Sequence, residues 1–377
     1  MLDLAAELDQ WCREGRAFAV ATVVAVGGSA PRRPGAALAV AADGTALGSV
    51  SGGCVEGAVY ELCRQALDTG RPLVERFGYA DADGLAVGLT CGGSVEVLVT
   101  PVPADAPARP ALGAALAAAA RGEAAALARV VAGPAPLPGG ALLVTPGARA
   151  AGGLGLGAAL DGAAARAAAD ALGAGRTGTV RVGDRGGLCG RQVTLFVECS
   201  LPPPRMLVFG AADFAAALVR AGAFLGYRVT VCDARPVFAT AARFPGAAEV
   251  VADWPHRYLE SERDRLDART VVCVLTHDAK FDVPLLVRAL RLPVAYVGAL
   301  GSRRTHADRL RRLREAGATE EELARLRAPI GLDLGARTPE ETALAIVAEV
   351  VALRRGGTGR PLTGTNLPLH RTVTGAF

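Results

Sequence analysis

Three consecutive prolines stand near the middle of the chain, in Leu201-Pro-Pro-Pro-Arg205. Such a run fits neither a helix interior nor a central strand, because each proline removes a backbone donor and fixes φ. It therefore predicts a boundary between an N-terminal domain, residues 1–200, and a C-terminal domain, residues 201–377. At roughly 100–200 residues per domain, a chain of 377 residues is long enough for two domains that each have their own core.

After the prolines, short apolar segments alternate with helical ones, such as the helix expected at residues 215–225. Alternation of this kind indicates βαβ units with right-handed crossovers. We therefore expect an α/β protein whose C-terminal domain is a Rossmann-like parallel sheet. Its last helix is expected to begin at Thr338-Pro-Glu-Glu341. The segments typical of buried strands are residues 205–210, 227–233, 270–276 and 294–298.

The N-terminal domain changes character along its length. Residues 1–100 alternate apolar strands with glycine turns, which indicates a mixed α/β module. Residues 101–180 consist largely of Ala and Gly. Because side chains this small offer little bulk to pack, we interpret this stretch as an insert in the module. A further strand is expected at residues 192–198.

The composition excludes several classes of protein. Charged residues make up 21% of the chain and the net charge is +4, so the chain is neither disordered nor basic enough to predict a nucleic-acid partner. The eight cysteines include no Cys-x-x-Cys pair, which argues against a structural zinc site and a disulfide framework. The N-terminal segment is acidic, unlike a signal peptide, and no segment is fit to span a membrane, so we expect a reduced, cytoplasmic protein.

The turn after the first strand of the C-terminal domain matches a dinucleotide-binding fingerprint only in part. Gly210 opens the turn, and Asp233 ends the next strand, where an acid binds ribose hydroxyls in such folds. However, Ala212 replaces the glycine that lets the backbone approach pyrophosphate, and Asp213 adds a negative charge. An NAD(P)-dependent oxidoreductase, with Asp233 on the ribose and Arg235 near a 2′-phosphate, is therefore the alternative hypothesis and not the leading one.

Further loops of this domain follow the carboxyl ends of its strands, which is the edge where doubly wound sheets bind ligands. The loop at residues 301–304 leads into a helix, so its unpaired amides and two arginines form a candidate anion cradle. The candidate ligand-binding residues of this domain are Gly210, Asp233, His277, Asp278, Gly301, Ser302, Arg303, Arg304 and Asp333.

The N-terminal module has a candidate site of its own. Gly52, Gly53 and Cys54 lead into a helix, and the amides and dipole of a helix N-terminus lower the pKa of a thiol. Flanking glycines also let a bulky ligand reach the sulfur. Cys91 stands before two further glycines, and Arg32 lies in the first glycine-rich segment. Cys54 and Cys91 are therefore candidate reactive or metal-binding thiolates.

Together these segments resemble the XdhC/CoxI family. In the N-terminal module the resemblance rests on Gly27-Gly-Ser-Ala-Pro-Arg32, Ser51-Gly-Gly-Cys-Val-Glu56 and Cys91-Gly-Gly93. In the C-terminal domain it rests on Leu275-Thr-His-Asp-Ala-Lys-Phe-Asp282, Tyr296-Val-Gly-Ala-Leu-Gly-Ser-Arg-Arg304 and Pro329-Ile-Gly-Leu-Asp-Leu-Gly-Ala-Arg-Thr-Pro-Glu-Glu341. One departure concerns the turn at residues 210–213, where the family has a Gly-x-Gly-His type of turn and this chain has Gly-Ala-Ala-Asp.

The resemblance implies an accessory role rather than a turnover reaction. Members of this family serve molybdenum hydroxylases such as xanthine dehydrogenase and carbon monoxide dehydrogenase. They bind the molybdenum cofactor (molybdopterin), protect it, assist its sulfuration and deliver it to the apoenzyme. By this resemblance we expect transient cofactor binding, with Cys54 and Cys91 facing molybdenum or carrying sulfur, and with Arg303 and Arg304 holding phosphate.

The resemblance also implies partners. These are a molybdenum hydroxylase apoenzyme, a cysteine desulfurase and a second copy of the chain as a homodimer. A third hypothesis is a scaffold that only recruits a sulfurtransferase. Under that hypothesis Cys54 and Cys91 could both be replaced by alanine without loss of function.

Overall fold

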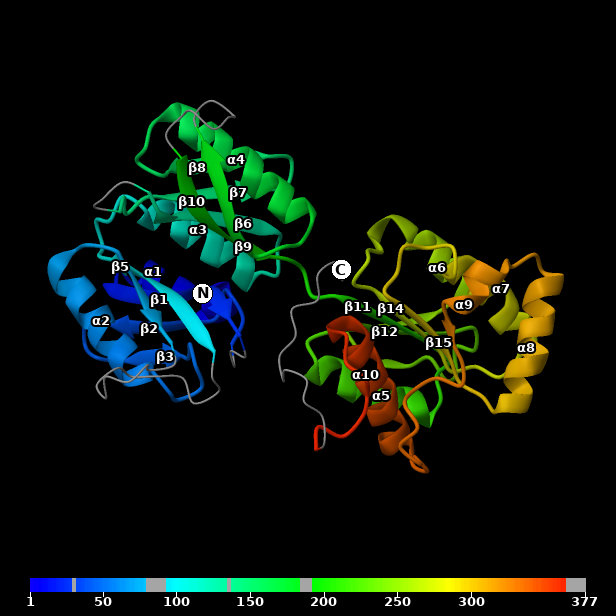
Figure 1. Ribbon diagram of the computed structural model, residues 1–377. Helices are drawn as coiled ribbons and strands as arrows, with labels where there is room; N and C mark the ends of the chain where they lie inside the picture. Colours follow the sequence, from blue (N-terminus) through cyan, green and yellow to red (C-terminus); the bar gives the residue numbers. More distant parts are fainter. Residues whose placement is uncertain (29–31, 79–92, 134–136, 184–191, 364–377) are drawn as a thin grey trace. The chain divides into compact units, whose positions relative to one another are not determined.

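A computed structural model describes residues 1–28, 32–78, 93–133, 137–183 and 192–363 of the chain (Figure 1). The chain divides into two compact units, and the division falls within the proline run. Unit 1 comprises Met1–Pro202, and unit 2 begins at Pro203. Each unit is described by itself below.

The described part of unit 1 contains two antiparallel sheets with the same topology. Their strand orders are β3-β2-β1-β5-β4 and β8-β7-β6-β10-β9. The first half consists of α1 (Ala5–Arg13), β1 (Phe18–Gly27), β2 (Ala37–Ala41), β3 (Ala46–Gly48), α2 (Glu56–Thr69), β4 (Leu73–Phe77) and β5 (Ser94–Val102). The second half consists of α3 (Arg109–Ala120), β6 (Ala125–Ala132), β7 (Ala141–Thr145), β8 (Arg149–Gly153), α4 (Ala158–Gly173), β9 (Gly178–Gly183) and β10 (Gln192–Ser200). Each half reads helix, three strands, helix, two strands, so unit 1 is an internal structural repeat.

The first strand of each half is buried on both faces. In β1, Ala19 packs on the side of α2, and Phe18 packs on the side of α1 and α3. In β6, Ala126 packs on the side of α4, and Leu127 packs on the side of α1 and α3. Successive strand residues point to opposite faces, so a strand covered on both sides is apolar at most positions. The helices α1 and α3 therefore belong to a core that both sheets share.

The Ala- and Gly-rich stretch, which we interpreted as an insert, forms α3, β6, β7, β8, α4 and β9. Alanine is the strongest helix former, and small side chains let neighbouring elements approach closely. At Gly152, φ is +85°, and a Cβ would lie 2.7 Å from the Cβ of Ala111 and 2.4 Å from the carbonyl oxygen of Ala141. The small side chains are thus the packing surface of the second sheet, and the stretch is part of the scaffold of unit 1.

A buried polar cluster around Arg129 connects the two halves of unit 1. Nη2 of Arg129, in β6, lies 3.2 Å from a carboxylate oxygen of Glu198, in β10. The same guanidinium donates hydrogen bonds to the hydroxyl groups of Thr22, in β1, and Thr100, in β5, at 3.1 Å and 3.4 Å. These charged and hydroxyl groups are all buried. An arginine of the second half therefore donates hydrogen bonds to two hydroxyl groups of the first half at a buried contact.

Over residues 203–363, unit 2 forms a parallel sheet with the strand order β13-β12-β11-β14-β15-β16. This order is that of a doubly wound dinucleotide-binding fold. The expected α/β class, with an N-terminal mixed module and a C-terminal Rossmann-like parallel sheet, is confirmed. The strands are β11 (Arg205–Phe209), β12 (Arg228–Asp233), β13 (Glu249–Ala252), β14 (Val271–Val274), β15 (Tyr296–Ala299) and β16 (Leu326–Arg327).

Helices cover both faces of this sheet. The helices α5 (Asp213–Phe224) and α10 (Pro339–Arg355) lie side by side on one face, where Leu218 and Ile346 enter the same core (Figure 1). Thr338 caps α10 in a capping box with Glu341, as the sequence predicts. The opposite face carries α6 (Pro255–Ser261), α7 (Ala279–Ala289), α8 (Arg303–Glu315) and α9 (Glu320–Ala324).

Candidate functional site

The carboxyl ends of the parallel strands in unit 2 meet at one edge of the sheet. The central strand β11 has β12 on one side and β14 on the other, and the connections leave it in opposite directions. Ligands bind at such a switch point because the turns diverge there and leave a crevice. Four of the predicted residues end or follow strands at this edge, namely Gly210, Asp233, His277 and Gly301.

The turn after β11 is held by Asp233. Gly210 has a φ of +109°, and a Cβ there would lie 3.0 Å from the backbone nitrogen of Thr276. Asp233 is buried, and its carboxylate accepts a hydrogen bond of 2.8 Å from the amide of Ala211 and further bonds from Arg235. Burial favours a higher pKa for Asp233, but these bonds outweigh it and hold the pKa below its usual value. A ribose would have to compete with them, which weakens the oxidoreductase hypothesis.

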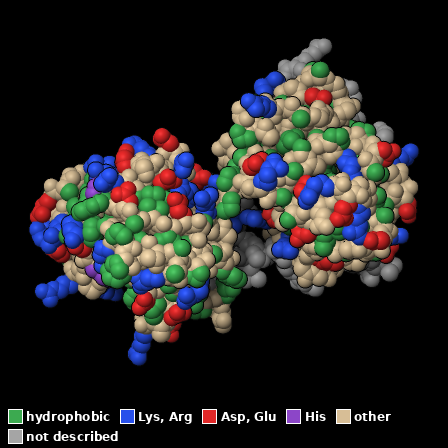
Figure 2. Space-filling model, turned by 180° about the vertical axis from the view of Figure 1, so that it is seen from behind, with side chains coloured by type: hydrophobic (Ala, Val, Ile, Leu, Met, Phe, Trp, Pro, Cys, Tyr) green, Lys and Arg blue, Asp and Glu red, His purple; other side chains and the backbone are tan. Residues whose placement is uncertain are grey.

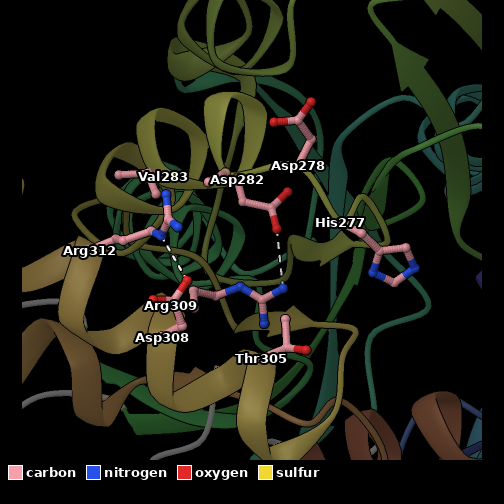
Figure 3. Close-up of a pocket in the computed structure, with 9 residues that line it drawn as sticks. His277, Asp278, Asp282, Val283, Thr305, Asp308, Arg309 and Arg312 are labelled. Carbon is pink, nitrogen blue, oxygen red and sulfur yellow. Dashed lines mark hydrogen bonds and ion pairs between the residues drawn. The ribbon is translucent and has the colours of Figure 1, made fainter.

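A pocket of about 390 Å³ opens beside the first turns of α7 and α8 (Figure 3). His277 and Asp278, both predicted as site residues and both exposed, line it. Asp278 also caps α7 by accepting a hydrogen bond from the amide of Lys280. The remaining lining residues are Ala279, Asp282, Val283, Thr305, Asp308, Arg309 and Arg312. The sequence therefore located one wall of the pocket and missed the wall that α8 provides.

A buried ion pair forms the floor of this pocket. Nη2 of Arg309 lies 3.1 Å from a carboxylate oxygen of Asp282 and donates a hydrogen bond of 2.8 Å to the carbonyl oxygen of Leu300. The hydroxyl of Thr276 donates to the other oxygen of Asp282. Burial raises the pKa of Asp282 above its usual value, although Thr276 and Arg309 act in the opposite direction. Arg309 was not among the residues predicted from the sequence. The pattern that could have indicated it is a charged residue four positions before Leu313, on the buried face of α8.

The helix α8 begins as the sequence predicts, with Ser302 as its N-cap. The hydroxyl of Ser302 accepts a hydrogen bond of 3.1 Å from the amide of Thr305. Gly301 has a φ of +147°, and its backbone lies close to the ion pair, since a Cβ there would be 3.6 Å from Nη1 of Arg309. Arg303 and Arg304 are exposed and are not among the residues that line the pocket. The arginine at the pocket floor is therefore Arg309.

Asp333 lies in the loop after β16 and is exposed. This loop is anchored at its start, where the amide of Gly331 donates a hydrogen bond of 2.9 Å to Glu349 of α10. Asp333 is not among the residues that line the pocket. The structure therefore places it at the same edge of the sheet but gives it no contact with the pocket.

In unit 1, the loop before α2 is organised around one carboxylate. Glu56 accepts hydrogen bonds from the hydroxyl of Ser49 at 2.6 Å, and from the amides of Ser51, Gly52 and Gly53 at 2.8–2.9 Å. Burial favours a higher pKa for Glu56, but the serine and backbone bonds outweigh it and lower the pKa to about 2. The amides that were expected to act on the thiol of Cys54 are thus directed at a carboxylate within the chain.

Cys54 lies within this loop, between the glycines and α2. Gly52 and Gly53 are exposed, with φ of +80° and +124°, and Cys54 is half-buried against the core under α2. The amide of Cys54 donates to the hydroxyl of Ser51 at 3.0 Å, which fixes its backbone. Arg32 is described and exposed. Cys91 lies outside the described residues.

Three other described cysteines, Cys63, Cys232 and Cys273, are core residues. Burial raises the pKa of the Cys63 and Cys232 thiols to about 12, and it also raises the pKa of Cys273. These thiols are therefore protonated and unreactive. Across the described ranges, no group of three or more His, Cys, Asp or Glu side chains is arranged to hold a metal ion. A metal bound by described residues would need fewer protein ligands.

The surface carries charges of both signs. On the face seen in Figure 2, Lys and Arg side chains alternate with Asp and Glu over each unit, in keeping with a net charge of +4. In the part of the chain that the structure describes, no helix is both long enough and apolar enough to cross a membrane.

Two family models match the chain. The model described as the XdhC and CoxI family matches residues 11–78 and 118–183, and the model described as the XdhC Rossmann domain matches residues 206–350. The first matches parts of both halves of unit 1, including the stretch that we interpreted as an insert. The second matches the parallel sheet of unit 2.

Curated relatives match part of the chain. Over 153 residues, it is 32% identical to the "Molybdenum cofactor insertion chaperone PaoD" of Escherichia coli. This match covers 41% of this chain and 41% of that protein. Over 165 residues, it is 28% identical to a protein of Bacillus subtilis described as a probable xanthine dehydrogenase subunit, and this match covers 44% of this chain and 47% of that protein. Over 174 residues, it is 31% identical to "Uncharacterized protein YqeB" of Escherichia coli. This match covers 45% of this chain and 31% of that protein. Each match thus spans less than half of the relative's length.

A solved structure shares the fold over nearly the whole chain. It comes from Bacillus halodurans and is described as a xanthine dehydrogenase. The TM-score is 0.67, with 96% of this chain and 98% of that chain covered, at 23% sequence identity. At this identity the likeness supports the fold of both units and nothing beyond it.

Proposed function

The chain belongs to the XdhC and CoxI family, as its motifs predict, and on this premise we propose that it is an accessory protein that binds the molybdenum cofactor. In this role it protects the cofactor, helps to sulfurate it and delivers it to a molybdenum hydroxylase of the xanthine dehydrogenase or carbon monoxide dehydrogenase type. The names of two relatives, a molybdenum cofactor insertion chaperone and a probable xanthine dehydrogenase subunit, support this assignment. The cofactor is cargo here, and no turnover reaction is assigned to the chain.

The observation that carries the proposal in unit 1 is the position of Cys54. Its loop is fixed by the hydrogen bonds to Glu56, and among the residues that the structure describes it is preceded by two exposed glycines. Molybdenum and sulfane sulfur are both thiophilic, so a thiol on a rigid, open loop suits either one. We propose that Cys54 binds molybdenum or carries sulfur, and we propose the same role for Cys91.

The proposal includes partners. A molybdenum hydroxylase apoenzyme receives the cofactor, and a cysteine desulfurase supplies the sulfur. We propose that the chain forms a homodimer through the outer face of α10, where Leu344 and Val351 are exposed seven residues apart. The cytoplasm is the proposed location, because its reducing conditions keep the thiols of this site reduced.

The proposal is tested by the molybdenum and pterin content of the protein, purified without oxygen from a molybdate-fed host. We expect near-stoichiometric molybdenum in the wild type and its loss in Cys54→Ala, because the variant lacks the proposed thiol ligand. The matched control is Cys12→Ala, which removes another half-buried thiol, in α1, and should keep the wild-type content. The mass of the same preparation in solution reports whether the chain is a dimer.

Two outcomes would contradict the proposal. The first is a wild type without molybdenum that instead binds NADPH in a manner sensitive to Asp233→Ala, which would favour the oxidoreductase hypothesis. The second is full molybdenum content in Cys54→Ala and in Cys91→Ala, which would mean that neither thiol holds the cofactor.

A further inference from the structure

The pocket of unit 2 contains a buried donor without an acceptor. Arg309 uses Nη2 for both the ion pair with Asp282 and the hydrogen bond to the carbonyl oxygen of Leu300. Its other terminal nitrogen, Nη1, is buried and has no hydrogen-bond partner within the described ranges. The side chain is 4% exposed. A buried N–H group without an acceptor is costly in a folded protein, and this one belongs to a residue that lines a pocket.

The position of Nη1 is defined by its neighbours. It lies 3.6 Å from the point where a Cβ of Gly301 would stand, and Thr305 borders that same point at 3.3 Å. Figure 3 shows the guanidinium of Arg309 between the carboxylate of Asp282 on one side and Thr305 on the other. The spare nitrogen therefore lies under the turn with which α8 begins, and the amides of a first helical turn have no acceptor within the helix.

The charges around the pocket permit an anion. Three carboxylates line it, but each is already ion-paired within 3.1 Å: Asp278 with Lys280, Asp282 with Arg309, and Asp308 with both Arg311 and Arg312. The N-termini of α7 and α8 both lie at the pocket, and each contributes a partial positive charge. An incoming anion would therefore meet neutralised carboxylates, two helix dipoles and one unused guanidinium nitrogen.

We infer that this pocket is an oxyanion subsite that takes a phosphate monoester. Nη1 of Arg309 donates to the phosphate from the floor, and the hydroxyl of Thr305 and the first-turn amides of α8 that Ser302 does not cap donate from the side. Arg309 replaces the exposed Arg303 and Arg304 as the main cationic contact. The inference rests on the proposed function only for what carries the phosphate, which would be the pterin cofactor; the phosphate chemistry of the pocket stands on its own residues.

The test measures binding of inorganic phosphate to the full chain by titration calorimetry, against chloride at equal ionic strength. The wild type should bind phosphate saturably. Arg309→Lys keeps a cation beside Asp282 but removes the spare nitrogen, so the affinity should fall about tenfold. Thr305→Val removes an exposed hydroxyl without altering the core, and it should weaken binding by a smaller factor. The control Arg314→Ala, at the exposed far end of α8, should bind as the wild type does.

Thermal unfolding establishes whether each variant is folded. If Arg309→Lys does not fold, Thr305→Val still tests the inference. The inference is overturned if the wild type shows no saturable phosphate binding, if neither pocket variant weakens it, or if Arg304→Ala weakens it more than the pocket variants do. The two proposals can fail separately. Phosphate binding through Arg309 in a chain that never carries molybdenum supports the subsite and refutes the cofactor role. Molybdenum in a chain without phosphate binding does the reverse.

Discussion

In unit 1, α2 and α4 each follow the third strand of their sheet, yet the loops that lead into them differ. The loop before α2 contains two serines, two glycines and Cys54, whereas the loop before α4 reads Leu154-Gly-Leu-Gly157. In each loop, backbone amides donate hydrogen bonds to the carboxylate of an acidic residue. Glu56 accepts several hydrogen bonds from its loop, and Asp161 accepts one bond, of 2.9 Å, from the amide of Leu154. One topology therefore carries a loop with a cysteine in the first half and a loop of Gly and Leu in the second.

A second difference lies in the packing. The core under α2 is mostly Val and includes Phe77, whereas the core under α4 combines Leu and Val side chains with alanines. It also supplies the arginine whose guanidinium reaches the hydroxyl groups of Thr22 and Thr100 in the first half. This comparison suggests that the second half supports the first, and three matched pairs of substitutions test that idea.

The largest effect is expected at the buried ion pair. Arg129→Met leaves buried Glu198 with only the N-terminal ammonium of Met1 as a charged partner, so unit 1 should lose about 3 kcal/mol of unfolding free energy. The control Arg121→Met removes an exposed pair with Glu123 in the same half and should leave the stability unchanged. Trp11 is buried in unit 1 and Trp254 is exposed in unit 2, so Trp11 fluorescence in a Trp254→Phe background measures the unfolding of unit 1. Equal effects of the two substitutions would show that the halves do not depend on this contact.

The next effect is expected at two cysteines in corresponding positions. Cys91 stands three residues before β5 begins at Ser94, and Cys189 stands three residues before β10 begins at Gln192. Only the first half also has Cys54, so we expect Cys91→Ala to lower the molybdenum content about tenfold and Cys189→Ala to leave it unchanged. Metal analysis of both purified variants decides the matter. A loss in Cys189→Ala of the same size would mean that both halves bind the cargo.

The smallest effect is expected at the two loop carboxylates. Glu56→Gln should cost about 1–3 kcal/mol at neutral pH, because hydrogen bonds to a charged acceptor are lost. The pKa of Glu56 is about 2 in the folded chain against an ordinary value of 4.5, so its contribution is complete above pH 4.5 and is lost as the pH falls towards 2. Asp161→Asn, which weakens a single backbone bond, should cost less. Denaturant midpoints of both variants and the wild type between pH 7 and pH 3 measure the difference. A pH-independent gap between Glu56→Gln and the wild type would argue against this role of Glu56.

Much of the fold could be predicted from the sequence. The spacing of apolar segments after the proline run predicts the parallel sheet of unit 2, Thr338 caps its helix as expected, and a helix begins after Ser302 as expected. The structural repeat in unit 1 could not be recognised from the sequence. The many Ala and Gly residues of the second half leave few of the bulky apolar positions from which strands are predicted. The same small side chains made a packed scaffold resemble an insert.

The candidate sites were predictable only at the level of loops. Chain order places His277 and Asp278 at a strand end, but the partner of Asp282 lies 27 residues further along the chain, on a helix face that reads as core. The amides before α2 were expected to act on the thiol of Cys54, whereas the amides of Gly52 and Gly53 donate to Glu56, two positions later. In both cases the deciding contact is made by a side chain whose direction depends on packing and not on spacing.

The carboxylate inside the Cys54 loop has a consequence for selectivity. Phosphate, sulfate and nucleotides are abundant in cells, and an open ring of amides would attract them. Because Glu56 already occupies the donors of Ser51, Gly52 and Gly53, these anions find little to bind beside the thiol. Competition at Cys54 is therefore restricted to species with affinity for sulfur, such as soft metal ions and oxidants. Under the proposed function, a loop whose amides are occupied in this way favours a thiophilic cargo over the common anions of the cell.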